Sequence, residues 1–164
     1  MKTALFIVAT ILFSTAAHAD IYDEYQYSGR RALELARVQP ATDGTVPTEE
    51  LIAEINLMIG FGWQIMDLYS SKFEGCKDQF VQLKELSIDI GLLSYDQIDE
   101  LYHDGKGLVK APKECYRGRS LVVHPYQVIA LALENRLVTD AEHVEHEMDE
   151  VIVRAGAIRD LLNK

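Results

Sequence analysis

The stretch CYRGRSLVVHPYQVIALALENRL, residues 115–137, decides the fold of this chain. Its middle, from Leu121 to Leu133, is apolar on nearly every side of a helix and is interrupted only by His124, Pro125 and Gln127. A helix that is apolar all round belongs in the core of a protein rather than on its surface. We therefore expect a central helix here, with the other helices of the chain packed around it.

Two residues indicate where this central helix begins. Proline is tolerated in the first turn of a helix, where its missing N–H has no partner to lose. Ser120 and Pro125 therefore predict a start at Ser120, with Pro125 in the first turn. The preceding residues 106–119 are expected to form a long loop, because they include Gly107, Pro112 and Gly118.

Apolar residues recur at helical spacing along the rest of the chain. They predict helices over three further ranges, residues 20–38, 49–74 and 77–89. Ser94 and Gln97 have the spacing of a capping box, which opens a shorter helix ending near Asp104. Glycines interrupt the range 49–74 at Gly60 and Gly62, and we expect close helix contact or a slight kink there, the alternative being room for a ligand.

The last helix has the most regular amphipathic pattern. Thr139 and Glu142 form a second capping box, and apolar residues then recur at steps of four and three, at Val144, Met148, Val151, Ala155, Ile158 and Leu162. No comparable run of period two occurs, so the sequence predicts an all-α, single-domain bundle of five or six helices. We expect its core to be led by Trp63, Ile129, Leu133, Val144, Met148, Val151 and Ile158.

The N-terminus has the layout of a secretory signal peptide. A positive start at Lys2 precedes a short apolar run, and Ala17-His18-Ala19 is a small-x-small cleavage site. We expect cleavage after Ala19, which leaves residues 20–164 as one domain. The apolar run is too short for a permanent anchor, so we expect a periplasmic or secreted protein without a transmembrane segment after cleavage.

Cys76 and Cys115 are the only two cysteines of the chain. In an oxidising compartment two cysteines usually pair, so we predict a disulfide between them. It would close a loop of about 40 residues, a constraint worth roughly 4 kcal/mol in the chain-entropy model. No CxxC or CxxCH spacing is present, so neither a redox pair nor covalent haem is indicated.

The charge distribution points to one candidate binding surface. The formal net charge of −10 argues against nucleic acid as a partner, yet one segment is basic. Tyr116 adds an aromatic side chain of the kind enriched at interfaces. The predicted contact for an acidic partner or anionic ligand comprises Lys106, Lys110, Lys113, Tyr116, Arg117 and Arg119. The alternative is solvated charge that balances the acidic helices.

Two sets of residues are candidate metal or cofactor ligands. His143, His146 and Glu150 share one flank of the last helix, and imidazole with carboxylate suits zinc, copper or nickel. The alternative for this set is a solvated charged face on which Glu150 pairs with Arg154. His124 is expected to be a satisfied core or helix-start histidine. The alternative for His124 is ligation of a non-covalent haem together with a methionine, namely Met58, Met66 or Met148.

No catalytic constellation is visible in the sequence. There is no G-x-S-x-G elbow, no free cysteine, and no pairing of two carboxylates, although folding can bring distant carboxylates together. The sequence therefore favours a non-enzymatic binding or inhibitor-type protein, immunity-like or an envelope accessory, with a protein partner in the cell envelope. The alternative is a metal- or haem-binding helical bundle. No cofactor is required by the sequence, and a transition metal is the one that it allows.

Overall fold

The computed structural model describes residues 21–37 and 48–164. The predicted signal peptide and its cleavage site lie outside the described residues. Residues 21–37 form the first helix. It is followed by α2 (Thr48–Lys72), α3 (Lys77–Glu85), α4 (Ser87–Ile90), α5 (Tyr95–Ile98), α6 (Cys115–Leu133) and α7 (Ala141–Leu162). A 3-10 turn covers Glu74–Cys76 and a π-helical turn covers Asp99–His103.

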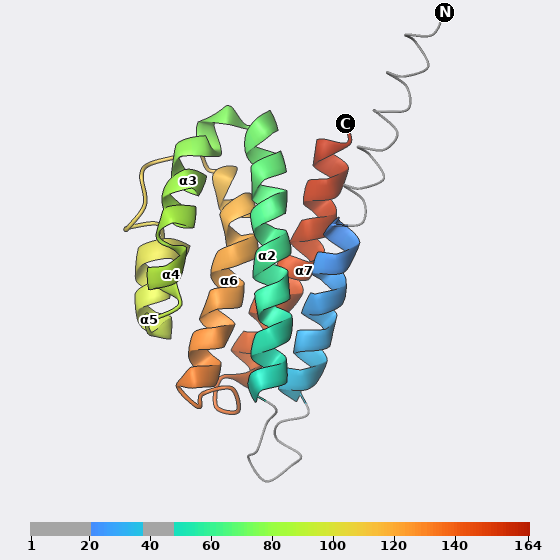
Figure 1. The fold of residues 1–164 in the computed structure, drawn as a ribbon, viewed down its shortest axis with the longest axis vertical. Helices are drawn as coiled ribbons and strands as arrows, with labels where there is room; N and C mark the ends of the chain where they lie inside the picture. Colours follow the sequence, from blue (N-terminus) through green and yellow to red (C-terminus); the bar gives the residue numbers. More distant parts are fainter. Residues whose placement is uncertain (1–20, 38–47) are drawn as a thin grey trace, which may run out of the picture.

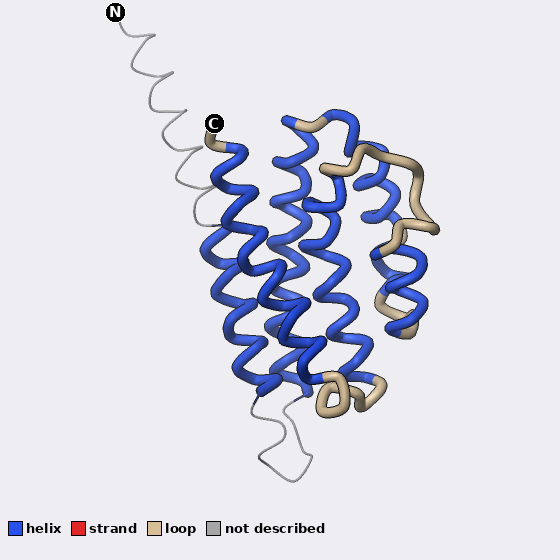
Figure 2. The backbone as a smooth tube through the Cα atoms, turned by 180° about the vertical axis from the view of Figure 1, so that it is seen from behind, coloured by secondary structure: helices blue, strands red, loops and turns tan. Residues whose placement is uncertain are grey.

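The long helices run alongside one another, and the short ones lie to one side (Figure 1). Helix α6 occupies the middle, between the long helices α2 and α7 and the short helices α3, α4 and α5. The described residues contain no strand (Figure 2). The all-α bundle is thus confirmed, although the predicted helix 77–89 is divided into α3 and α4 at Leu86.

The central helix begins earlier than the sequence predicted. Helix α6 starts at Cys115, so the prediction of a start at Ser120 and of a loop reaching Arg119 was wrong. Packing explains the extra turn, because Gly118 is buried and an added Cβ there would lie 2.5 Å from Cζ of Phe80 on α3. The first turn of α6 is therefore held in place by its contact with α3.

Pro125 lies in the interior of α6 and not in its first turn. Proline has no N–H, so the carbonyl oxygen of Leu121, one turn earlier, loses its usual helical partner. The hydroxyl of Tyr25 donates to this oxygen at 2.8 Å from the first helix, and the Tyr25 side chain is fully buried. A proline that would otherwise leave a buried acceptor without a partner is thus accommodated by a tertiary hydrogen bond.

Removal of this hydroxyl should destabilise the fold. We expect Tyr25→Phe to lower the free energy of unfolding by about 1–3 kcal/mol, because it leaves the buried Leu121 carbonyl without a donor. Urea denaturation followed by circular dichroism measures the change. Tyr27→Phe is the control, since Tyr27 is 62% exposed. Equal stabilities of the two variants would show that the hydroxyl of Tyr25 is not needed.

Helices α2 and α6 approach closely at Gly62. An added Cβ on Gly62 would lie 2.8 Å from the carbonyl oxygen of Leu121, whereas one on Gly60 would meet nothing within 4 Å. Close helix contact is therefore confirmed for Gly62 and wrong for Gly60. By length and composition alone Glu49–Lys72 could cross a membrane, but its inner residues, such as Ile65, are fully buried within the bundle core.

The predicted disulfide between Cys76 and Cys115 is present. The two Cα atoms are 5.3 Å apart and both residues are fully buried. Cys76 ends the 3-10 turn that follows α2, and Cys115 is the first residue of α6. The bond therefore ties the corner between α2 and α3 to the start of the central helix.

Most of the predicted core is confirmed. Five of its members are buried, namely Ile129, Val144, Met148, Val151 and Ile158, while Trp63 is only partly buried. Leu133 was a wrong prediction, since it is 60% exposed. It is the last residue of α6, and the chain turns there, so the buried Leu137 takes the inward position instead.

Candidate functional site

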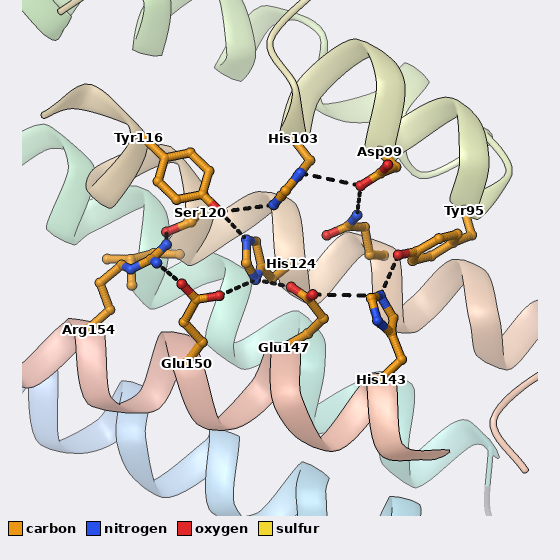
Figure 3. Close-up of polar contacts among 12 residues, drawn as sticks. Tyr95, Asp99, His103, Tyr116, Ser120, His124, His143, Glu147, Glu150 and Arg154 are labelled. Carbon is orange, nitrogen blue, oxygen red and sulfur yellow. Dashed lines mark hydrogen bonds and ion pairs between the residues drawn. The ribbon is translucent and has the colours of Figure 1, made fainter. Parts of the chain in front are cut away.

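A cluster of polar side chains is enclosed between α6, α7 and the π-helical turn (Figure 3). We call it the histidine cluster and define it as Asp99, His103, Tyr116, His124 and Glu147. His124 is completely buried and Glu147 is 8% exposed. Polar groups buried to this extent are costly unless they are paired, so the contacts within the cluster determine whether it is tolerated.

The two histidine rings present the same nitrogen to one hydroxyl group. The Tyr116 hydroxyl oxygen lies 2.8 Å from Nε2 of His103 and 3.3 Å from Nε2 of His124. The two ring centroids are 5.1 Å apart. Since a phenol has a single proton, it can donate to only one of these nitrogens. The space around the Tyr116 hydroxyl is therefore rich in lone pairs.

The opposite nitrogen of each ring faces a carboxylate. Nδ1 of His124 contacts Oε2 of Glu147, and Nδ1 of His103 lies 3.3 Å from Oδ1 of Asp99. Both contacts are close enough for an ion pair, but neither Nδ1 atom is aligned for a hydrogen bond with its carboxylate. Both rings thus have one edge toward a carboxylate and the other toward the shared hydroxyl.

The local fold positions the His103 half of the cluster. Asp99 and His103 are the two ends of the π-helical turn, a rare element that is frequent at functional sites. The side chain of Gln127 on α6 donates to Oδ1 of Asp99 at 3.0 Å. Arg119, also on α6, donates to the His103 carbonyl oxygen at 2.8 Å. The turn is therefore clamped onto the central helix from both ends.

The surroundings set the charge states of the cluster. Burial lowers the pKa of His103, and the neighbouring His124 adds to this effect. The carboxylates of Asp99, Glu147 and Asp104 oppose the shift without cancelling it. Burial would raise the pKa of Glu147, but the neighbouring histidines His124, His143 and His103, with His124 the foremost, together hold this pKa below its ordinary value. The site thus favours a neutral imidazole at His103 and a carboxylate at Glu147.

A third histidine, His143 on α7, extends the cluster toward the surface. Nε2 of His143 lies 3.6 Å from Oε1 of Glu147 and contacts the hydroxyl of Tyr95. Burial, with the nearby charges of Asp99 and Glu147, raises the pKa of Tyr95 to about 12. Tyr95 is therefore a phenol at neutral pH.

The structure separates the metal ligands that the sequence proposed. His143 contacts Glu147, whereas His146 is exposed at the surface. Glu150 is paired with Arg154, as expected for the alternative of a charged face, and it also lies 3.9 Å from Nδ1 of His124. Among the described residues, potential ligand atoms within 4.8 Å of one another occur in two groups, His103–His124–Glu147 and Asp99–His103–Asp104.

His124 is a core histidine, as expected, but it lies well inside α6 and not at a helix start. The sequence analysis missed its partners, His103 and Glu147. Both ring nitrogens of His124 face polar groups, which does not favour haem ligation with a methionine. Met58, Met66 and Met148 are buried in the apolar core, as predicted for core residues.

The residues of the predicted partner contact point in different directions. Lys110, Lys113 and Arg117 are exposed, and Lys106 is exposed but pairs with Glu100. Arg119 is directed inward to Gln79 and to the π-helical turn. Tyr116 is directed toward the histidine cluster. Only the four exposed cations remain candidates for a partner contact, which stays a prediction.

The chain was also compared with known proteins. No family model, curated protein or solved structure matches it. The candidate function is therefore argued from the side chains of this chain alone, and above all from the histidine cluster.

Proposed function

We propose that this is an exported helical bundle that binds a transition-metal ion through Nε2 of His103 and Nε2 of His124. Glu147 lies at the Nδ1 edge of His124 and Asp99 at the Nδ1 edge of His103, so each carboxylate orients one ring. The ion binds at the edge of the rings that faces Tyr116, because the Nδ1 edge of His124 is already occupied by Glu147. Zinc, copper and nickel are the ions suited to imidazole ligands.

One observation carries this proposal: both histidines have Nδ1 toward a carboxylate and Nε2 toward a common point. Histidines that bind metals almost always donate their second ring N–H to a carboxylate, a carbonyl oxygen or water. This contact fixes the tautomer and makes the free nitrogen a better ligand. Two histidines with Nδ1 toward a carboxylate and Nε2 toward one point have the orientation that is common in metal sites.

A purely structural role is less well supported. Buried ion pairs add little stability compared with apolar residues of similar volume, because desolvation offsets their attraction. A core that needed only stability would be better served by leucine or methionine at His124 and Glu147. The disulfide Cys76–Cys115 supports export, since such bonds persist in oxidising compartments.

Calorimetric titration with zinc, copper and nickel tests the proposal. We expect one site in the full chain, weakened about 100-fold or more in His103→Gln and in His124→Gln, since each loses a ligand. His146→Ala is the control and should bind as the wild type does, because His146 is exposed and outside the cluster. Circular dichroism of each variant verifies that it is folded.

Two results would overturn the proposal. The first is the absence of heat for all three metals at micromolar protein concentration. The second is normal binding by His103→Gln together with loss of binding in the double variant His143→Ala/His146→Ala. That second result would place the metal site on the face of α7 that the sequence suggested.

The exposed cations favour a second candidate function, the binding of an acidic partner in the cell envelope. Lys110, Lys113 and Arg117 have no ion pair with the carboxylates of the described residues. Exposed charges of this kind steer association more than they stabilise a fold. Metal binding is preferred, because the histidine cluster is buried and its contacts converge, whereas the cations only share a surface.

A further inference from the structure

We infer that Tyr116 is the third ligand of the site and that the site takes an oxidised, phenolate-binding ion, ferric iron or cupric copper. This inference rests on the proposed function. The hydroxyl group of Tyr116 points toward both histidines of the histidine cluster (Figure 3). A third ligand matters here, because two histidines alone do not distinguish one transition metal from another.

The distances around the Tyr116 oxygen match those between ligands of one ion. Metal–ligand bonds of about 2.0–2.1 Å, with tetrahedral or octahedral angles, place neighbouring donor atoms about 2.8–3.4 Å apart. The Tyr116 oxygen lies 2.8 Å from Nε2 of His103 and 3.3 Å from Nε2 of His124. An ion that replaces the phenolic proton can therefore be bound by all three atoms without a large movement.

Two positive charges lie against the Tyr116 ring. The guanidinium carbon of Arg154 is 4.8 Å from the ring centroid, and that of Arg119 is 5.2 Å away. Guanidinium groups so placed are attracted to the electron-rich face of the ring. Their attraction increases when the ring carries negative charge, so they stabilise the phenolate that coordinates a metal. Both arginines also have polar partners, Arg119 at the His103 carbonyl oxygen and Arg154 at Glu150, and these contacts hold the two guanidinium groups beside the Tyr116 ring.

The donor chemistry and the redox environment favour an oxidised ion. A phenolate is a hard, anionic oxygen donor, and the carboxylates of Asp99 and Glu147 offset the charges of the two arginines. A ferric or cupric ion binds such an oxygen donor well. The disulfide Cys76–Cys115 indicates an oxidising compartment, in which iron and copper are present in these oxidation states.

Visible absorption tests this assignment directly, because a phenolate bound to ferric iron or cupric copper gives a charge-transfer band that zinc does not give. We expect titration of the full chain with ferric nitrilotriacetate or cupric sulfate to produce such a band, saturating at one equivalent. Tyr116→Phe should lose the band and still bind zinc through the two histidines, within about tenfold of wild type. Tyr126→Phe, also on α6 but outside the cluster, is the matched control and should keep the band.

The outcomes separate the two proposals. A band that persists in Tyr116→Phe, or iron and copper that bind without any band, would overturn the role of Tyr116. Zinc binding that depends on His103 and His124 would still support the metal site in that case. Absence of binding by zinc, iron and copper alike would overturn both proposals.

Discussion

We expect the single replacement His124→Leu to lower the free energy of unfolding of the metal-free protein by about 3–5 kcal/mol. The expected loss of stability comes from Glu147, which would be left without its partner, and not from the missing histidine itself. Glu147 is 8% exposed and held as a carboxylate by His124, and removing one member of a buried pair leaves an uncompensated charge. Urea denaturation at neutral pH measures the loss.

The double variant His124→Leu/Glu147→Leu is the control for this prediction. It removes both members of the pair, and we expect it to recover most of the stability that the single variant loses, since apolar replacement of a buried pair is often neutral or stabilising. The two changes should therefore be strongly non-additive. Additive losses, or a His124→Leu protein as stable as the wild type, would show that the two side chains do not act as a pair.

The second large effect is expected at Val151. This residue is fully buried on the inner face of α7, and Val151→Asp would place a charge there without a partner. We expect the variant not to fold, and its far-ultraviolet circular dichroism spectrum to lose most of its helical signal. A soluble Val151→Asp protein with the wild-type melting curve would mean that α7 presents a different face to the core.

Leu133 provides the matched control. It is equally apolar and was also predicted for the core, but it is 60% exposed at the end of α6. We expect Leu133→Asp to change stability by no more than about 0.5 kcal/mol, as is usual for surface substitutions. Unfolding of both variants would contradict the structure at the C-terminal end of α6.

Local sequence patterns were sufficient to predict the fold class. The stripe from Val144 to Ile158 predicted the inner face of α7, and the apolar run after Leu121 predicted a buried helix. The beginning of α6 could not be predicted in this way. It depends on a contact between Gly118 and Phe80 and on the hydroxyl of Tyr25, which replaces the donor that Pro125 lacks. Both are tertiary interactions, and no local propensity encodes them.

The candidate site was less predictable than the fold. Sequence neighbours on one helix suggested His143, His146 and Glu150, because spacing along a helix is visible in a sequence. The histidine cluster instead joins the π-helical turn to α6 and α7, three successive elements whose side chains meet only through tertiary packing. One signal was available: Glu147 interrupts the apolar face of α7 beside Met148. A charge on a buried face indicates a partner, and here that partner is His124.

The central claim is that one metal ion is bound between His103 and His124. Anomalous diffraction from crystals of the zinc-loaded protein, collected above the zinc absorption edge, tests it most directly. The account predicts one strong anomalous peak about 2.0–2.1 Å from Nε2 of both His103 and His124. A peak held instead by His143 and His146 on α7, with His124 still bonded only to Glu147 and Tyr116, would contradict it.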